Sequence, residues 1–449
     1  MSCALPPLAQ LLAELVAIPS VSGAEQALGR YVAQLLQGCG MTVARQPLVG
    51  CPGELAMLHG AQDRTKAGPA WPAHAAAQAA AGGGRGPHAA FPGEARAARQ
   101  RCGGVGRGAP GAPLSGERFN VVADSGGEGP AWLLAGHLDT VPVAACWAGD
   151  PFRLRHSGRR ASGLGAWDMK GGLAALLQVA SRWQPGHPRL KLAFLADEEW
   201  ESAGSHILVH SGFLDGVGAA LVPEAGGVGP AGAARARLAL VLGRTGRVLL
   251  EVELRGRPVH GAVTGGSSAL LAAARAALAA GEAPTAHHPR LGRGRAVLRE
   301  LHSGSQGALT VPEQGWLQLD RLLVPPETAE DAAAGLAAFL AGQPLGAAAQ
   351  VRIVPRQSPY LEAYTYEPEH PLVRCVSERL AGAGVSAGLC WDPSPADENR
   401  LVMAGIPALS LCPVGGEAHE AEEWVDMDSL EELTRGLTAI VAGPPPPRS

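Results

Sequence analysis

Short apolar runs alternate along this chain with stretches in which apolar residues recur every three or four positions. The helical spacing predicts two helices within residues 8–38, separated by a break at 18–23. It predicts further helices at 173–182, 371–380 and 428–441, and the apolar runs predict strands at 41–44, 119–123, 131–135, 191–195, 219–222 and 408–411. Strands that alternate with helices indicate an α/β layer architecture, with functional loops at the strand ends.

The pattern changes near Gly243. Residues 248–254 alternate like a half-exposed strand, and 315–322 form another strand, while 268–280 and 327–341 have the spacing of helices. Two helices packed on one face of a sheet make a small α+β unit. We therefore expect a larger domain in two parts, residues 1–243 and 356–449, interrupted by an inserted domain at 244–355.

Residues 51–117 follow neither period. Runs of alanine, glycine, proline and arginine cannot bury enough apolar surface to offset chain entropy, so a disordered insertion is expected. An RNA-binding role for this Arg- and Gly-containing segment is an alternative. The four prolines at 444–447 are expected to form a frayed tail.

Composition narrows the class of protein. The 449 residues carry a net charge of -4, which does not indicate a broad surface for nucleic acid or for an anionic membrane. No apolar run of about twenty residues predicts a membrane span or an export signal. The 8 cysteines are scattered without a CxxC pair, which fits a reducing cytoplasm.

The stretch 133–172 carries the first candidate chemistry. An apolar run leads directly to His137, with Asp139 two residues later, and Asp168 stands between a glycine-rich turn and a helix pattern. Further candidate ligands follow predicted strands downstream, namely the acidic triplet at 197–199, Glu224 and His419. Imidazole and carboxylate ligands suit zinc, and a carboxylate that bridges two ions makes a two-metal hydrolytic centre.

Each of these residues also has a simpler interpretation. His137 alone could be a hydrogen-bonded loop residue, Asp168 a helix cap, and Glu198 part of a solvated acidic turn. Glu224 alone says little, and His419 lies in a charged run typical of wet surfaces. Their order along the chain is what favours a metal site, because each follows a predicted buried strand or a glycine-rich turn.

As an ordered set, these motifs resemble the di-zinc metallopeptidases that include acetylornithine deacetylase, succinyl-diaminopimelate desuccinylase and glutamate carboxypeptidase. The resemblance covers most of residues 8–48 and 118–440. The matching segments are 136–142, 168–172, 197–199, 223–224, 256–261, 418–419 and 423–425. It implies a three-layer α/β zinc-peptidase catalytic domain with an inserted α+β lid, which also forms a homodimer.

The resemblance also implies a role for each site residue. His137 binds one metal and His419 the other, Asp168 bridges them, and Glu199 and Glu224 each complete one metal's ligands. Asp139 accepts a hydrogen bond from His137 and fixes its tautomer. Glu198 is the general base for a metal-bridging water that attacks an amide carbonyl.

Two residues of the lid region are expected to bind substrate. His260 corresponds to a histidine that stabilises the oxyanion across a dimer or after domain closure, although it could be a plain surface residue. Arg356 is the candidate for binding a substrate carboxylate, and Arg321 is an alternative that is as readily structural.

The sequence therefore predicts a cytoplasmic, metal-dependent amidohydrolase with two divalent ions. Zinc is favoured, with cobalt or manganese as alternatives. Its substrate would be an N-acyl amino acid or a short peptide that is cleaved at a C-terminal peptide-like amide bond, and no nucleic acid or membrane partner is expected. The alternatives are a dipeptidase of the same family and a catalytically silent binding protein on this fold.

Overall fold

The computed structural model describes residues 5–48, 118–227, 236–304 and 307–447. The predicted disordered insertion at 51–117 lies outside these residues. None of the described helices is long and apolar enough to cross a membrane.

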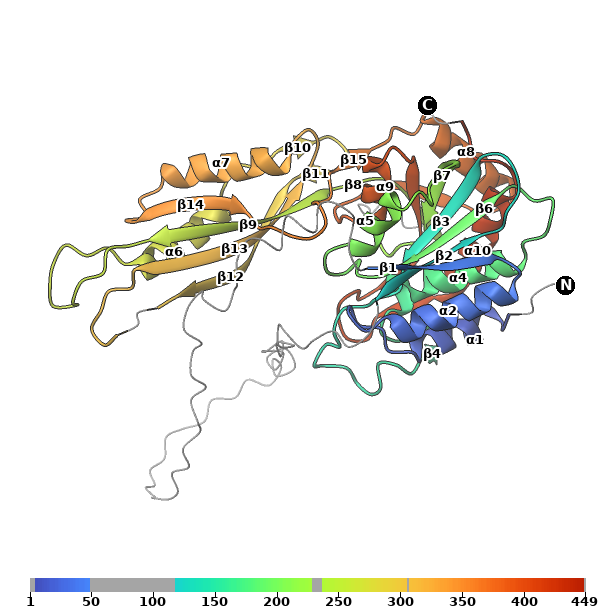
Figure 1. Cartoon of the computed structure of the whole chain (residues 1–449), viewed down its shortest axis with the longest axis horizontal. Coiled ribbons are helices and arrows are strands. Elements are labelled where there is room, and N and C mark those ends of the chain that lie inside the picture. The colour runs from blue at the N-terminus through green and yellow to red at the C-terminus, as the bar shows by residue number, and fades with distance from the viewer. Residues whose placement is uncertain (1–4, 49–117, 228–235, 305–306, 448–449) are drawn as a thin grey trace, which may run out of the picture. The chain divides into compact units, whose positions relative to one another are not determined.

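A large mixed sheet organises most of the described chain (Figure 1). Its strands run in the order β1-β2-β6-β3-β7-β17-β8-β15, and β16 pairs with β8. The strands are β1 (Thr42–Pro47), β2 (Phe119–Asp124), β3 (Ala131–His137), β6 (Leu190–Leu195), β7 (Val217–Val222), β8 (Leu238–Arg244), β15 (Tyr364–Thr365), β16 (Ala387–Asp392) and β17 (Ala408–Pro413).

Helices cover both faces of this sheet. On one side α4 (Gly171–Ser181) contacts α1 (Leu8–Val16), α2 (Gln26–Gly38) and α10 (Met427–Val441), and α10 also contacts α8 (Pro371–Gly382). On the other side α5 (Ala203–His210) and α9 (Asp397–Met403) contact each other and the strands (Figure 1). Every residue of β3, β6 and β7 is buried, as the uninterrupted apolar runs of doubly covered strands require.

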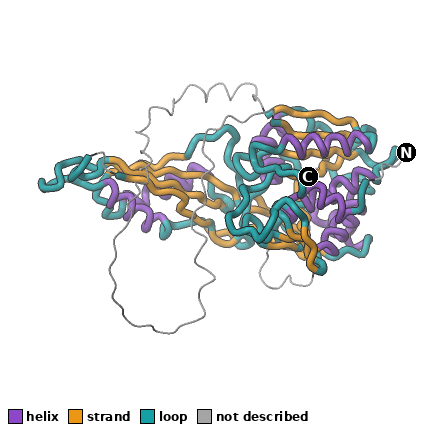
Figure 2. The backbone as a smooth tube through the Cα atoms, turned by 90° about the horizontal axis from the view of Figure 1, so that it is seen from below, coloured by secondary structure: helices purple, strands orange, loops and turns teal. Residues whose placement is uncertain are grey.

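A second, four-stranded antiparallel sheet has the order β12-β13-β9-β14. It consists of β9 (Gly246–Arg255), β12 (Arg295–Ser303), β13 (Gln314–Leu323) and β14 (Ala348–Ile353), with β10 (His287–His288) and β11 (Gly292–Arg293) as a small separate pair. Alternate residues of β9 and β13 are buried against α6 (Ala269–Ala280) and α7 (Ala329–Ala341), which makes a core separate from that of the large sheet. In Figure 2 these helices run beside their strands.

A third, smaller sheet joins two distant loops. It pairs β4 (Arg155–Ser157) and β5 (Arg160–Ser162) with β18 (Gly415–Gly416) and β19 (Trp424–Asp426). These strands flank the turn at Ala166–Lys170 and the loop that carries His419. The predicted α/β fold with an α+β unit is confirmed.

The prediction of a frayed tail at 444–447 was wrong. Trp132 Nε1 donates a hydrogen bond to the Gly443 carbonyl at 2.8 Å, and Arg379 Nη2 donates to the Pro444 carbonyl at 2.7 Å. Pro445 is buried and packs against Gly218. The proline run forms no secondary structure, but its carbonyl oxygens and rings find partners at the end of the large sheet.

Candidate metal centre

His137, Asp168 and Glu224 converge at one end of the large sheet. His137 is the last residue of β3, Asp168 lies in the turn before α4, and Glu224 comes two residues after β7. His137 Nε2 lies 3.1 Å from Asp168 Oδ1 and 3.4 Å from Glu224 Oε1. The three side chains each offer one donor atom, and these atoms lie within 4.8 Å of one another.

A second group uses the other oxygen of the same aspartate. His419 Nε2 lies 3.2 Å from Asp168 Oδ2 and 3.1 Å from Glu199 Oε2. The side chain of His419 is 54% exposed, whereas that of His137 is 1% exposed. One group is therefore enclosed by protein, and the other borders solvent.

The sheet topology explains why these residues meet. β3 pairs in parallel with both β6 and β7, and β17 is parallel to β7. The carboxyl ends of parallel strands lie at the same edge of a sheet, so the loops that follow them are neighbours. His137, Glu199, Glu224 and His419 all come at or after such ends.

The acidic triplet is held by its backbone. The Asp139 carboxylate accepts hydrogen bonds from the backbone N–H groups of Glu198 and Glu199, both at 3.1 Å, and from the Ser22 hydroxyl at 2.7 Å. Asp197 stands at the start of this loop with a φ of 73°. These contacts orient the loop so that Glu199 reaches the second group.

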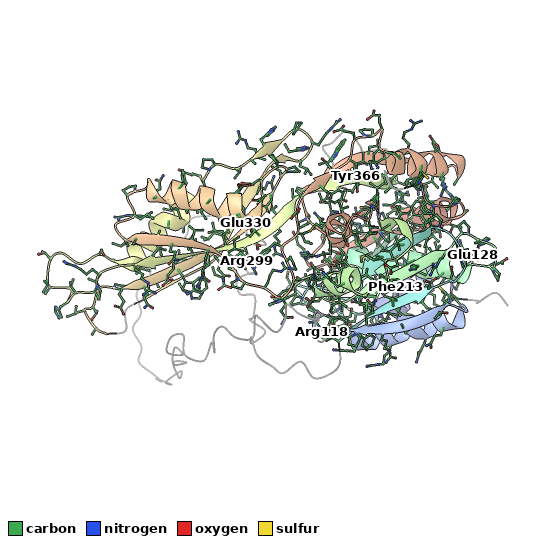
Figure 3. The ribbon with its side chains drawn as sticks, turned by 45° about the horizontal axis from the view of Figure 1, so that its top comes forward. Arg118, Glu128, Phe213, Arg299, Glu330 and Tyr366 are labelled. Carbon is green, nitrogen blue, oxygen red and sulfur yellow. The ribbon has the colours of Figure 1, made fainter. Side chains whose placement is uncertain are left out.

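Arg118, which is labelled in Figure 3, contacts the same loop. Its Nη2 donates to Asp197 Oδ1 at 2.6 Å, and it also forms an ion pair with Glu25. The sequence did not single out Arg118, because it adjoins a segment without a recognisable pattern. The only available signal was its position one residue before a predicted strand.

The structure corrects one expected contact. His137 Nδ1 was expected to donate to the Asp139 carboxylate, but its 2.9 Å partner is the Asp139 backbone carbonyl, and the nearest carboxylate oxygen is 3.8 Å away. The carboxylate is occupied instead by the acidic loop and Ser22. A carbonyl accepts only, so Nδ1 carries a hydrogen and donates it there, and Nε2 is the ring nitrogen that faces Asp168 and Glu224.

The Asp168 side chain does not cap the helix that follows. The residue at the N-cap of α4 is Lys170, without a side-chain capping bond, and both Asp168 oxygens face histidines. The helix-cap interpretation of Asp168 is therefore wrong.

The charges of the clustered side chains shift one another's pKa values. Burial disfavours charge on both His137 and Asp168, but their hydrogen bonds and opposite charges raise the pKa of His137 and lower that of Asp168. Hydrogen bonds to Asp168 and Glu199 raise the pKa of His419 to about 11. The carboxylates thus stabilise positive charge at both histidines.

Two glutamates of the cluster have raised pKa values, in contrast to the lowered pKa of Asp168. Burial, opposed by the charge of His137 and reinforced by that of Asp168, raises the pKa of Glu224 to about 8. Burial likewise raises the pKa of Glu198 well above its usual range, against the charge of His137. Carboxyl groups crowded in this way favour any ligand that brings positive charge among them.

The donor set fits two divalent cations. Glu199 Oε1 and Glu224 Oε2 are buried, and within the described part of the chain neither has a hydrogen-bond partner. A buried carboxylate oxygen without a donor is costly unless a cation meets it. Two histidines, two glutamates and a shared aspartate are thus a candidate ligand set for two cations.

The two predicted substrate-binding residues lie in different surroundings. Arg356 Nη2 donates to Ser358 Oγ at 2.7 Å and to the carbonyl of Glu201, two residues beyond Glu199. His260 is exposed in the loop after β9, and its Nδ1 accepts from the Ala262 N–H at 3.2 Å. The structure thus brings Arg356 to the acidic loop and does not bring His260 into the ligand cluster.

Arg321 has a structural partner. Its Nη2 lies 2.6 Å from Glu327 Oε1, in an ion pair that ties β13 to the segment before α7. This supports the structural alternative for Arg321.

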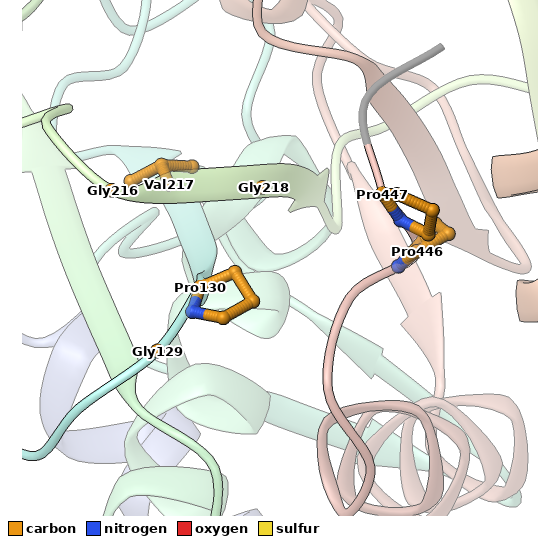
Figure 4. Close-up of a pocket in the computed structure, with 7 residues that line it drawn as sticks. All are labelled: Gly129, Pro130, Gly216, Val217, Gly218, Pro446 and Pro447. Atoms are coloured by element: carbon orange, nitrogen blue, oxygen red, sulfur yellow. The ribbon is translucent and has the colours of Figure 1, made fainter.

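A hollow of about 400 Å³ lies elsewhere, against the C-terminal prolines (Figure 4). Glycine, proline and valine line it, at Gly129, Pro130, Gly216, Val217, Gly218, Pro446 and Pro447. No lining side chain is ionisable, so this hollow offers no acid, base or ligand.

Comparison with known sequences gives a consistent family match. Residues 133–443 match the profile of peptidase family M20/M25/M40. The succinyl-diaminopimelate desuccinylase of Wolinella succinogenes is 26% identical over 321 residues, which cover 69% of this chain and 84% of that enzyme. The corresponding Acidiphilium cryptum enzyme is 28% identical over 330 residues, which cover 71% of this chain and 84% of that enzyme.

Solved structures share the fold at lower identity. A Staphylococcus aureus tripeptidase has a TM-score of 0.66 at 18% identity and covers 97% of both chains. An M20 family metallo-carboxypeptidase from Sulfolobus solfataricus has a TM-score of 0.67 at 14% identity, covering 98% of this chain and 99% of its own. A dinuclear metal-binding peptidase of Bacillus subtilis has a TM-score of 0.62 at 14% identity, covering 97% and 96%.

Proposed function

The chain belongs to peptidase family M20/M25/M40, and from that premise we propose a two-metal amidohydrolase that removes an N-acyl group from an amino acid or cleaves a C-terminal peptide-like amide. The observation that carries the proposal is the position of Asp168. Its two carboxylate oxygens lie 3.1 and 3.2 Å from the Nε2 atoms of two different histidines. Each histidine has one further glutamate beside it.

Two cations would share Asp168. His137 and Glu224 would complete the enclosed site, and His419 and Glu199 the solvent-facing one. When bound, the ions would polarise the amide carbonyl and lower the pKa of the attacking water. Zinc is favoured by the mixture of imidazole and carboxylate ligands, and cobalt or manganese would suit the same donors.

Glu198 is proposed as the general base. It adjoins Glu199 and is partly buried, and its burial, opposed by the charge of His137 and reinforced by the nearby carboxylates, raises its pKa. It would take a proton from the attacking water and deliver it to the nitrogen of the leaving amine. A carboxyl with a raised pKa suits the second step, because it holds the proton until the amide bond breaks.

Arg356 is proposed to bind the substrate carboxylate. Its Nε is buried and has no hydrogen-bond partner among the described residues, while Nη2 is anchored to Glu201 and Ser358. An anchored guanidinium that keeps one N–H group without a partner can donate that group to a carboxylate. His260 is proposed to stabilise the oxyanion, which requires residues 244–355 to act as a lid that approaches the centre or a second chain to supply the group.

The proposed homodimer would form through this lid. Large apolar side chains are exposed on α6 (Leu271 at 57% and Leu278 at 79%) and on β12 (Val297 at 52% and Leu298 at 44%). β12 is also the edge strand of its sheet, so its backbone can pair with another strand. A cytoplasmic location is proposed from the cysteine usage of the sequence.

A dipeptidase is the second candidate activity. The fold relatives include a di-peptidase from Saccharomyces cerevisiae, with a TM-score of 0.65 at 13% identity, beside the tripeptidase and carboxypeptidase. The curated sequence relatives are desuccinylases, which favours acyl removal. A silent binding protein is disfavoured, because all five ligands and Glu198 are in the cluster.

A substrate panel tests the proposal. Purified protein supplied with zinc or cobalt is assayed for free amine released from N-succinyl and N-acetyl amino acids and from dipeptides. We expect turnover of acylated amino acids, its loss on chelation and its return on adding metal. Turnover of dipeptides alone would establish the second candidate, and no turnover by metal-loaded protein would contradict amide hydrolysis.

A further inference from the structure

A buried glutamate outside the ligand set holds the loop that carries Asp168. Glu423 is 1% exposed and lies four residues beyond His419. Its Oε1 accepts hydrogen bonds from the backbone N–H groups of Trp167 at 2.8 Å and Asp168 at 2.9 Å. Its Oε2 accepts from the N–H of Gly165 at 2.9 Å.

The backbone of the same residue adds another link. The Gly163 N–H donates to the Glu423 carbonyl at 3.1 Å. Directly beyond, β19 pairs with β5 in antiparallel register, so that Trp424 faces Ser162. The segment that leads to Asp168 therefore runs along the segment that follows His419.

Trp167 makes the complementary contact to the segment before His419. Its Nε1 donates to the Pro413 carbonyl at 2.9 Å. A Cβ atom at Gly415 would lie 2.3 Å from the indole Cγ, so only glycine allows this approach. The Asp168 loop is thus attached to the chain on both sides of His419.

These contacts determine where the shared carboxylate stands. The Asp168 N–H is itself bound by Glu423, and the Asp168 oxygens lie 3.1 Å from His137 Nε2 and 3.2 Å from His419 Nε2. Asp168 and its neighbour Met169 depart from helical geometry, so the following helix does not set their conformation. The carboxylate of Glu423 accepts hydrogen bonds from three backbone N–H groups of this irregular turn. Buried N–H groups need such acceptors where no helix or strand supplies them.

We propose that Glu423 is a positioning residue for the metal centre, which sets the backbone of Asp168 so that its carboxylate serves both cations. The inference rests on the proposed two-metal function. Glu423 donates no ligand atom and touches no reacting group. It acts through Asp168. In metal sites, residues that hydrogen-bond to a ligand orient that ligand, and replacing them costs about 10–100-fold in metal affinity or activity.

The test compares Glu423→Gln with Glu422→Gln. A glutamine has one accepting oxygen and an NH2 group that cannot accept, so at least one of the three N–H groups loses its acceptor. Glu422 is the matched control, because it is the preceding residue but faces outward, pairing with Arg155 at 2.5 Å with a side chain 44% exposed. Cobalt binding is titrated calorimetrically and by visible absorption, and kcat and KM are measured on the best substrate of the panel.

We expect Glu423→Gln to bind cobalt about 10–100-fold more weakly, while Glu422→Gln behaves as the unmodified protein. Substrate KM at saturating cobalt should stay unchanged, and kcat should recover as cobalt is raised. Cobalt affinities of Glu423→Gln within about twofold of the control would overturn the inference. Circular dichroism of the metal-free proteins checks the fold in each case.

A second pair keeps the test decisive if Glu423→Gln does not fold. Glu423→Asp retains both acceptor oxygens and the charge but is one methylene shorter, and Glu422→Asp is its control. We expect a smaller loss of cobalt affinity in the first variant only, and equal affinities would again overturn the inference. If the unmodified protein binds two cobalt ions but hydrolyses no amide, the proposed function fails while this comparison still decides the role of Glu423.

Discussion

Asp168 shows how much one side chain contributes to the centre. Its carboxylate is the only member common to both donor groups found in the described residues, and it is held between a buried and a half-exposed histidine. The hydrogen bonds of these histidines keep its pKa low despite burial. An ionised carboxylate with both oxygens aimed at imidazoles is prepared to bridge two cations.

Glu198 allows a test of chemistry apart from binding. We expect Glu198→Ala to retain two bound metals and to lose about 10²–10⁴-fold in kcat, because it removes the proton carrier and no proposed ligand. Metal content and steady-state rates measure the two effects separately. Trp200→Ala is the control from the same loop, since this side chain is 69% exposed. Near-normal turnover by Glu198→Ala would refute the base assignment.

At the scale of elements, the β1–β2 hairpin connects the site to the undescribed part of the chain. The two strands pair in antiparallel register up to Pro47 and Phe119, and the Leu48 N–H donates to the Arg118 carbonyl at 2.8 Å. The described chain thus stops at Leu48 and resumes at Arg118 in one closed pair. Arg118 then links this pair to Asp197 at the start of the acidic loop.

A shortened chain tests this hairpin. We expect replacement of residues 49–117 by an Asn-Gly turn to leave metal binding unchanged and kcat within about threefold, because Asn-Gly closes a two-residue hairpin in the existing register. Thermal stability should rise modestly, since a shorter loop costs less closure entropy. Loss of folding or of metal binding would mean that the segment contributes to the structure. Retained activity together with lost salt-dependent RNA binding would instead support the alternative raised by its composition.

At the scale of the whole molecule, the candidate metal centre and the proposed dimer interface lie on different sheets. The ligands cluster at the large sheet, whereas the exposed apolar residues of α6 and β12 belong to elements with their own core. Several large apolar side chains on one helix and an adjoining edge strand are typical of an interface between chains. Assembly can therefore be altered without touching a ligand.

Light scattering tests this assembly. We expect a mass of two 45.9 kDa chains for the unmodified protein and of one for the Leu278→Glu/Val297→Lys variant, because charges would be buried in the proposed interface. Leu389→Glu is the control, since this side chain is 41% exposed on β16 of the other sheet. A monomeric unmodified protein at micromolar concentration would contradict the homodimer.

The sequence by itself indicated the family, the candidate ligands and many of the helices and strands. Buried strands are uninterrupted apolar runs, and half-buried strands and helices repeat with periods of two and 3.6. Local patterning missed α5, α9, β8, β12 and β16, which only the structure shows. The candidate ligands could be proposed because each follows such a strand or a glycine-rich turn, and the ordered motifs indicated the family that the comparison confirms. The expectation for the proline tail failed because its partners, Trp132 and Arg379, are distant in sequence.

Only the tertiary structure decided which residues act together. The division of the five candidate ligands around Asp168, the backbone partner of His137 and the loop contacts of Arg118 depend on which strands become neighbours in the sheet. The bond from the Asp168 N–H to Glu423 spans 255 residues, so no local period can report it. Contacts between side chains that are so far apart in sequence depend on tertiary packing. A proposed positioning residue such as Glu423 can therefore be identified only in the structure, whereas candidate ligands can be proposed from local sequence patterns.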